Sequence, residues 1–226
     1  MFVTATGTDV GKTYAAALIL KELKRRGLNA GYYKAALSGA QPPFSAVQDD
    51  DAYVCRVAGL TSDEAVVSYR YRTAVSPCLA AGREGLQPPD KDRIRSDFFR
   101  MANRFDYTVV EGSGGILCPL NHSREGVFTI ADMVADLKLT SIIVADAGLG
   151  TLNAVKLTAD WMISHRLPIA GVLLNRFEKG NFLHEDNARM IDEWIHLPVL
   201  ALIESNADGA HFLLPPEQWF SEVSGI

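Results

Sequence analysis

The sequence has few of the features that would place it in several common protein classes. Its three cysteines, Cys55, Cys78 and Cys118, are far apart and form no CxxC pair, so a disulfide framework is not expected. The five histidines show no HxxxH or HxH spacing, which argues against a zinc site built from protein side chains. No apolar stretch approaches the roughly 20 residues needed to cross a bilayer. These absences argue against secreted, zinc-dependent and membrane-embedded proteins.

Positive charge is also scarce. The chain has 22 Lys and Arg residues against 27 Asp and Glu, a formal net charge of −5, and the two signs are interspersed. Because no long basic run is present to follow a phosphodiester backbone, nucleic acid is not an expected partner. The first residues, MFVTATG, lack the basic region that precedes the apolar part of a signal peptide. We therefore expect a cytoplasmic protein with no membrane partner.

The chain does contain enough apolar sequence for a sizeable core. Of its 226 residues, 48% are hydrophobic and 22% are charged, which suits one globular domain over residues 1–226. Six short apolar segments are predicted to be strands: 2–5, 30–33, 107–110, 141–145, 169–174 and 199–203. Segments with helical spacing of apolar residues lie between them, at 13–26, 90–105, 129–138, 151–165 and around 188–195.

The predicted strands are continuous apolar runs, as in Ile142-Ile143-Val144-Ala145, and do not alternate between polar and apolar residues. Strands buried on both faces have this character, which is typical of a parallel sheet covered by helices. The sequence therefore predicts an α/β fold, a single doubly wound domain with a mostly parallel sheet of the P-loop NTPase kind.

The most specific motif lies between the first predicted strand and the first helix. It reads Thr6-Gly7-Thr8-Asp9-Val10-Gly11-Lys12-Thr13. Backbone N–H groups of such a loop converge on phosphate oxygens, while Lys12 can reach the β- and γ-phosphates and the Thr13 hydroxyl can hold Mg²⁺. The strict pattern has glycine where this chain has Thr6, but strand, loop, GKT and helix follow in the order that a phosphate loop requires.

Other polar residues follow the predicted strands, at the edge where a doubly wound sheet binds its ligands. Lys34 follows the second strand and Glu111 the third, and Glu111 precedes the glycine-rich stretch Gly112-Ser113-Gly114-Gly115. P-loop enzymes need a carboxylate at this edge to hold Mg²⁺ and its waters. Asp49-Asp50-Asp51 opens a helix-like segment, and we expect Asp51 to join Glu111 and Thr13 at the metal while the other two cap the helix.

Taken together and in this order, GTDVGKT, YKAALSG, DDDA, VVEGSGG, GLGTLNA and LLN resemble dethiobiotin synthetase over about residues 2–176. Members of that family use ATP and CO2 to close the ureido ring of 7,8-diaminononanoate, giving dethiobiotin, ADP and phosphate. Three departures from the family's pattern stand out. Ala5 replaces a frequent glycine, Asp9 replaces a glutamate, and Ile203-Glu204-Ser205 lacks a proline that follows the last strand.

The resemblance implies a role for each matching residue. Lys12 and Lys34 are the expected catalytic residues, and Lys34 and Ser38 are expected to bind the diamine and its carbamate. Mg²⁺ is the expected cofactor, held by Thr13, Asp51 and Glu111. Asn175 is expected to read the adenine. The residues expected to bind the nucleotide are Asp9, Val10, Gly11, Lys12, Thr13, Tyr14, Asp51, Glu111, Gly112, Ser113, Gly114, Asn175 and Arg176.

The far carboxylate of the diamine needs a separate site. The stretch Ala147-Gly148-Leu149-Gly150-Thr151-Leu152-Asn153 lies between a strand and a helix, where glycines free the backbone N–H groups and the helix N-terminus is partly positive. An ordinary strand-to-helix turn is the alternative interpretation. The resemblance implies a homodimer in which Gly148, Leu149, Gly150 and Asn153 come from the partner subunit to bind the substrate.

Two other P-loop classes are alternatives to this interpretation. Amidating synthetases of the cobyrinate type also activate a carboxylate with ATP, but they carry a glutaminase domain for which this chain is too short. Partitioning-type ATPases, which act as partner-binding switches, carry a second lysine in the phosphate loop, and this loop has none.

Overall fold

The computed structural model describes residues 1–40, 49–124, 126–205 and 208–220. Its strands are β1 (Phe2–Ala5), β2 (Ala30–Ser38), β3 (Ala65–Tyr71), β4 (Tyr107–Glu111), β5 (Pro119–Ser123), β6 (Gly126–Thr129), β7 (Ser141–Asp146), β8 (Ile169–Asn175), β9 (Val199–Ile203) and β10 (His211–Phe212). Its helices are α1 (Lys12–Arg25), α2 (Asp50–Ala58), α3 (Pro77–Glu84), α4 (Lys91–Ala102), α5 (Ile130–Asp136), α6 (Thr151–Ser164), α7 (Phe182–Met190), η1 (Ile191–Ile195) and η2 (Pro216–Phe220).

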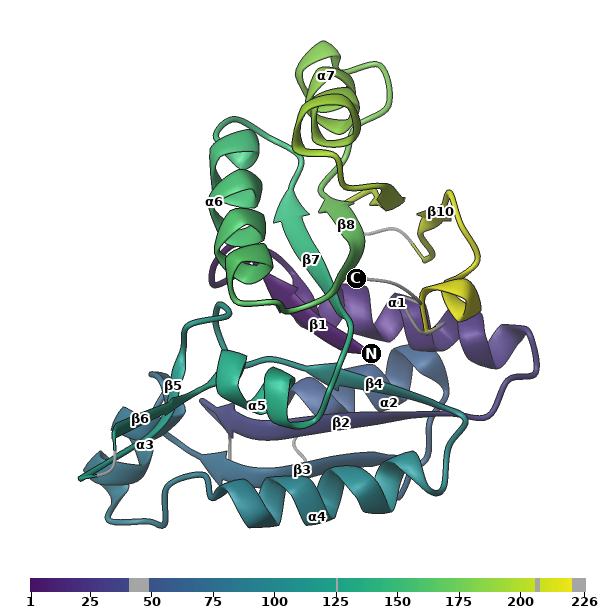
Figure 1. The fold of residues 1–226 in the computed structure, drawn as a ribbon. Helices are drawn as coiled ribbons and strands as arrows, with labels where there is room; N and C mark the ends of the chain where they lie inside the picture. The colour runs from purple at the N-terminus through teal and green to yellow at the C-terminus, as the bar shows by residue number, and fades with distance from the viewer. Residues whose placement is uncertain (41–48, 125, 206–207, 221–226) are drawn as a thin grey trace.

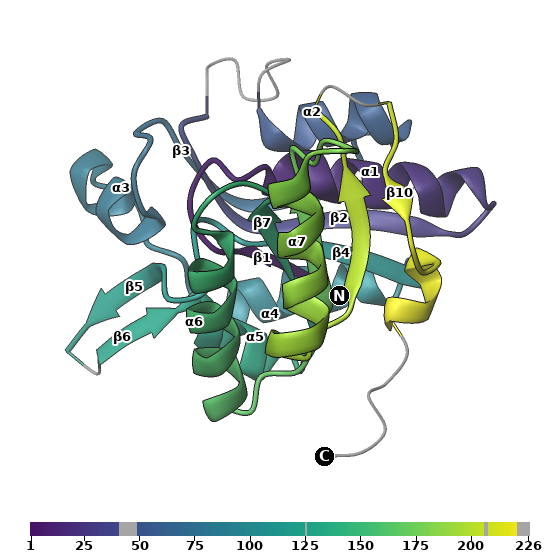
Figure 2. The same ribbon diagram turned by 90° about the horizontal axis from the view of Figure 1, so that it is seen from above.

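Eight strands form one central sheet in the order β10-β9-β8-β7-β1-β4-β2-β3 (Figure 1). Only β10 runs antiparallel to its neighbour, and the other paired strands are parallel. β5 and β6 pair separately as a hairpin that lies beside α3, away from the helices α6 and α7 (Figures 1 and 2). The first strand of the chain therefore becomes a central one, and it delivers the loop that follows it to the middle of the sheet edge.

The sheet is buried on both faces, and successive residues of a strand enter different cores. Val109 of β4 packs in the cluster that includes helices α1 and α2, whereas Val110 packs in the cluster that includes α4, α5 and α6. The neighbouring tyrosines of β2 divide in the same way, Tyr32 toward α1 and Tyr33 toward α4. Each strand must be apolar on both sides, which explains the continuous apolar runs of the sequence.

The predicted α/β fold with a mostly parallel sheet is confirmed, and all six predicted strands are present. One boundary was wrong in a way that matters for function. β2 continues to Ser38 because β3, which sequence patterning did not predict, pairs with it from Tyr32 to Ser38. Lys34 therefore lies within a strand and not after it. Among the described residues, no helix is long and apolar enough to span a membrane.

Candidate active site

The phosphate loop connects β1 to α1 at the carboxyl ends of the strands, near the middle of the sheet. α1 begins at Lys12, and the residue before it, Gly11, has a φ of 95°, in the left-handed region that favours glycine. A Cβ atom at Gly11 would also collide with the Asn175 side chain, whose Nδ2 donates to the Val10 carbonyl at 2.9 Å. Glycine is therefore required here both for the backbone turn and for the contact with β8.

Lys12 and Thr13 start the helix and face the cavity. The Lys12 ammonium donates to the Gly7 carbonyl at 3.1 Å, so its side chain folds back over the loop. Burial lowers the pKa of Lys12, and the positive charge of Lys34 adds to this, while the Glu111 carboxylate offsets part of it. A partly desolvated cation held over a loop of N–H groups favours an anionic ligand such as a phosphate.

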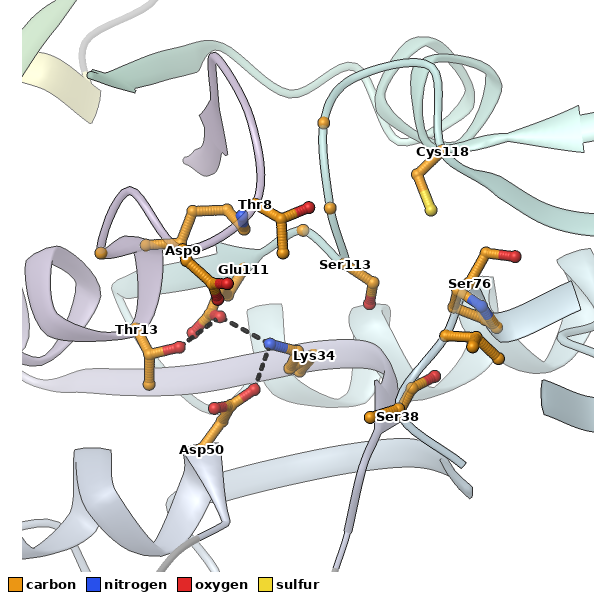
Figure 3. Close-up of a pocket in the computed structure, with 18 of the residues that line it drawn as sticks. Thr8, Asp9, Thr13, Lys34, Ser38, Asp50, Ser76, Glu111, Ser113 and Cys118 are labelled. Carbon is orange, nitrogen blue, oxygen red and sulfur yellow. Dashed lines mark hydrogen bonds and ion pairs between the residues drawn. The ribbon is translucent and has the colours of Figure 1, made fainter. Parts of the chain in front are cut away.

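Glu111 and Lys34 meet across neighbouring strands, because the register of β2 and β4 places them opposite one another. The Lys34 ammonium lies 2.5 Å from Glu111 Oε1 and 2.6 Å from Asp50 Oδ2, and the Thr13 hydroxyl donates to Glu111 Oε1 at 2.8 Å (Figure 3). Burial alone would lower the pKa of Lys34, but the Glu111 and Asp50 carboxylates outweigh it and the net shift is upward. Lys34 is therefore a buried, permanently charged ammonium.

The second acid of the site differs from the sequence prediction. Asp51 is directed away from the cavity, and its carboxylate receives both Arg70 guanidinium nitrogens, Nη1 at 3.0 Å and Nη2 at 2.5 Å. Asp50 lines the cavity beside Lys34 instead. Consecutive helical residues point about 100° apart, so in a run of three aspartates only the helix orientation decides which one faces the site. In this structure Asp50 therefore lines the cavity and Asp51 does not, while the expected role of Asp51 at a metal stays a prediction.

These groups line one cavity of about 1190 Å³. Its wall also includes Ser38, the segment Ala74–Pro77, the segment Gly112–Gly115, Leu117 and Cys118, and Figure 3 shows Ser38, Ser76, Ser113 and Cys118 around it. The buried Ser38 hydroxyl has no hydrogen-bond partner among the described residues, so it is available to a ligand. Tyr53, Arg56 and Cys118 also line the cavity and were missed by sequence reasoning, because nothing in their local pattern sets them apart.

The glycine-rich stretch after β4 approaches β1 and β2 closely. A Cβ atom at Gly112 would lie 2.7 Å from the Phe2 ring, so glycine is needed for this packing. The Ser113 hydroxyl donates to the Ala36 carbonyl of β2. Together with Gly114, these residues border the cavity.

Asn175 and Arg176 lie at the end of β8, on the other side of the phosphate loop. Asn175 is 4% exposed, and its Oδ1 atom has no hydrogen-bond partner among the described residues. The Arg176 guanidinium donates to the Asp9 carbonyl at 2.6 Å and to the Asp146 carboxylate. These two residues support the outer side of the loop, and neither lines the cavity that contains Lys34.

The turn before α6 is separate from the cavity. The Gly148 N–H donates to Asp146 Oδ1 at 2.9 Å, and Asn187 donates to the Ala147 carbonyl at 2.9 Å. Leu149 is 92% exposed, and Gly150 precedes the helix with a φ of 91°. Within one chain the structure therefore does not bring Gly148, Leu149, Gly150 or Asn153 to Lys34.

Comparisons with known proteins agree with this geometry. A family model described as AAA domain matches residues 1–210. A Brachyspira hyodysenteriae protein named ATP-dependent dethiobiotin synthetase BioD is 45% identical over 205 residues, which cover 90% of each chain. A Clostridium botulinum protein of the same name is 44% identical over 201 residues, 88% of each chain. The chain belongs to the dethiobiotin synthetase family.

More distant solved structures share the fold of this synthetase family member. A ParA family ATPase from Chlorobium tepidum superposes with a TM-score of 0.55 at 14% identity, covering 92% of this chain and 85% of its own. The MinD cell division protein of Aquifex aeolicus gives a TM-score of 0.52 at 13% identity, covering 90% and 80%. At such low identity the likeness supports the P-loop architecture alone.

Proposed function

We propose that this protein is an ATP-dependent dethiobiotin synthetase that converts 7,8-diaminononanoate, CO2 and ATP into dethiobiotin, ADP and phosphate. The observation that carries the proposal is the pair of buried lysines, Lys12 and Lys34, on one cavity with Glu111 and Thr13. The named relatives, at 44–45% identity over most of the chain, support the same reaction.

The reaction brings two anions together, which explains the need for two lysines. One amine of the substrate adds to CO2 and loses a proton, giving a carbamate anion. A carbamate oxygen then attacks the γ-phosphorus of ATP and displaces ADP. Lys12 on the phosphate loop and Lys34 on β2 would flank these two anions and reduce their mutual repulsion, which is electrostatic stabilisation of the transition state.

The resulting carbamic–phosphoric anhydride is open to attack at its carbonyl carbon. The second amine attacks that carbon, the C–O bond to phosphate breaks, and the five-membered ureido ring closes with release of phosphate and a proton. The Ser38 hydroxyl, buried at the cavity and lacking a partner among the described residues, is suited to bind the carbamate or its developing ring.

The residues present fit a magnesium ion bound together with nucleotide. Thr13 and Glu111 offer hard oxygen atoms that already lie 2.8 Å apart. In the described part of the chain, no group of three or more His, Cys, Asp and Glu side chains is arranged to hold a metal by itself. Thr13, Glu111 and Asp50 would therefore hold Mg²⁺ with phosphate oxygens and water, and the ion would neutralise charge on the phosphates.

We further propose that the enzyme is a cytoplasmic homodimer formed by a single domain per chain. The Gly148–Asn153 segment presents an exposed leucine and a helix N-terminus, but it does not line the cavity of its own chain. A partner subunit could bring this segment to the far carboxylate of the diamine, where backbone N–H groups would receive the charge. Asn175, at the other side of the loop, is the residue proposed to read adenine.

Mass spectrometry of a defined reaction mixture tests the function. Protein incubated with ATP, Mg²⁺, bicarbonate and diaminononanoate should form dethiobiotin, and phosphate release should require both the diamine and bicarbonate. The Lys12→Ala variant is the control for contaminating activity. ATP hydrolysis that needs neither substrate, with no dethiobiotin formed, would contradict the proposal and favour a switch-type ATPase.

A further inference from the structure

A buried tyrosine contacts the Glu111 carboxylate on the side that faces the core. The Tyr32 hydroxyl donates to Glu111 Oε2 at 2.7 Å, and the two side chains are 0% and 1% exposed. Tyr32 belongs to β2, between Lys34 and the start of the strand, and its register pairs it with Val109 of β4. The hydrogen bond therefore joins two neighbouring strands beneath the site.

The two oxygens of Glu111 have different surroundings. Oε1 receives the Thr13 hydroxyl at 2.8 Å and the Lys34 ammonium at 2.5 Å, and both of these donors line the cavity. Oε2 receives Tyr32, which is absent from the cavity lining. One oxygen thus faces the reactants and the other faces the core.

The two donors on the cavity side, Thr13 and Lys34, are proposed to bind other groups during the reaction. Thr13 would turn to the metal, and Lys34 would turn to the carbamate. A carboxylate buried in low dielectric is costly unless hydrogen bonds compensate for its lost hydration. When Thr13 and Lys34 engage ligands, Tyr32 is the donor that stays with Glu111.

We propose that Tyr32 is a positioning residue for Glu111, holding Oε2 so that Oε1 alone is presented to Mg²⁺ and its waters. Burial, reinforced by the nearby Glu111 carboxylate, raises the pKa of Tyr32 well above its ordinary value. The inference rests on the proposed function only in giving Glu111 a metal-related role.

The adjacent residue provides a matched control. Tyr33 is also 0% exposed, and its hydroxyl makes buried hydrogen bonds to Ser68 Oγ at 2.8 Å and to the Ile94 carbonyl at 3.2 Å. Because strand residues alternate, it lies on the opposite face of the sheet, away from Glu111. Removing either hydroxyl deletes one buried group of the same chemistry.

The experiment is a calorimetric titration of ATP into Tyr32→Phe, Tyr33→Phe and wild-type protein over a series of Mg²⁺ concentrations, without diamine. Tyr32→Phe should need about tenfold more Mg²⁺ for half-maximal enhancement of ATP binding, the change expected when a hydrogen bond to a charged group is lost. Tyr33→Phe should lose similar thermal stability and keep the wild-type Mg²⁺ dependence.

An unchanged Mg²⁺ dependence in Tyr32→Phe, or an equal change in both variants, would overturn the proposal, because the phenol would then be only a core group. The titration uses no ring-closing reaction, so failure of the proposed function would appear separately as absence of dethiobiotin with Mg²⁺-dependent ATP binding intact.

Nuclear magnetic resonance keeps the inference testable if Tyr32→Phe does not fold. In wild-type protein with ¹³C-labelled tyrosine, the Cζ resonance of Tyr32 should shift in the Glu111→Gln variant, and that of Tyr33 should not. No shift at Tyr32 would show that its hydroxyl is not coupled to Glu111, and the proposal would fall.

Discussion

Two parts of the same sheet edge differ in the side chains that they offer to a ligand. At the ends of β1, β2 and β4, charged side chains are buried and bonded to one another, with Lys34 5% exposed as a side chain and Glu111 1%. At the end of β7, the turn before α6 contributes no charged side chain of its own and exposes Leu149. The first region has the chemistry for phosphoryl transfer within one chain. The second offers backbone groups and the apolar side chain of Leu149, which is 92% exposed among the described residues.

The largest effect should come from a substitution in the first region, at the ends of β1, β2 and β4. Lys12→Ala removes the loop cation proposed to face the γ-phosphate, and turnover should fall by at least about a hundredfold, the usual result of deleting one transition-state donor. Thermal unfolding should change little, because the Lys12 ammonium donates its hydrogen bond to the Gly7 carbonyl of its own loop and not to a distant element. Steady-state kinetics with a denaturation curve would check both. Turnover near the wild-type rate would exclude this loop as the nucleotide site.

The next test concerns the second region, the turn before α6 that contains Leu149. Leu149→Glu adds a negative charge where the partner's turn is proposed to receive the substrate carboxylate, and the KM for the diamine should rise roughly tenfold or more by repulsion. Leu149→Gln has the same size without the charge and should stay near wild type. Since Leu149 is 92% exposed, neither change should affect the fold of one chain.

Mixing two variant subunits tests directly whether the turn before α6 acts on the partner's site. A heterodimer of Lys34→Ala and Leu149→Glu subunits would carry both defects in one site and none in the other, so its one active site should show the wild-type KM for the diamine. Purified heterodimers whose active site keeps the raised KM of Leu149→Glu would place the carboxylate site within a single chain. A protein that runs as a monomer near 24.7 kDa during catalysis would argue the same way.

A smaller, more discriminating effect separates neighbouring aspartates. Asp50→Asn should lower turnover by about tenfold and raise the Mg²⁺ requirement, because Asp50 lines the cavity and contacts Lys34. Asp51→Asn should cost about 2 kcal/mol of folding stability through its bond to Arg70 and leave the Mg²⁺ requirement unchanged. The reverse pattern, measured by kinetics and thermal melts, would restore Asp51 as the acid at the metal.

The smallest effect should be at Asn175. Its Oδ1 atom is buried without a partner among the described residues, and an amide can donate and accept together on one edge of adenine. Asn175→Ala should reduce the preference for ATP over GTP by about tenfold. An equal loss of affinity for both nucleotides would show that Asn175 only supports the phosphate loop through its bond to Val10.

Sequence patterning predicted the fold well because parallel strands buried on both faces appear in the sequence as continuous apolar runs. It missed β3, an edge strand that mixes buried and half-buried residues, and the β5–β6 hairpin, which is short, largely half-buried or exposed, and outside the main sheet. For the site, strand ends indicated Lys34 and Glu111, which the register then places side by side.

Helix phase and strand alternation limit what the sequence can give for the site. Asp50 could not be distinguished from Asp51 until α2 was packed against β2. Tyr32 gave no signal at all, because a tyrosine in an apolar strand resembles any other core residue. The direction in which these side chains point depends on how two distant segments pack together, and a local sequence pattern does not contain that information.

The central position of β1 also has a consequence for biosynthesis. β1 ends at Ala5, yet its two neighbours are β4, which ends at Glu111, and β7, which ends at Asp146. During translation the first strand must wait for both, since a parallel pair cannot form before its distant partner exists. The phosphate loop therefore cannot acquire its working shape until β4 and β7, which lie much later in the chain, have been made. A nascent chain that stops before Asp146 should not retain ATP.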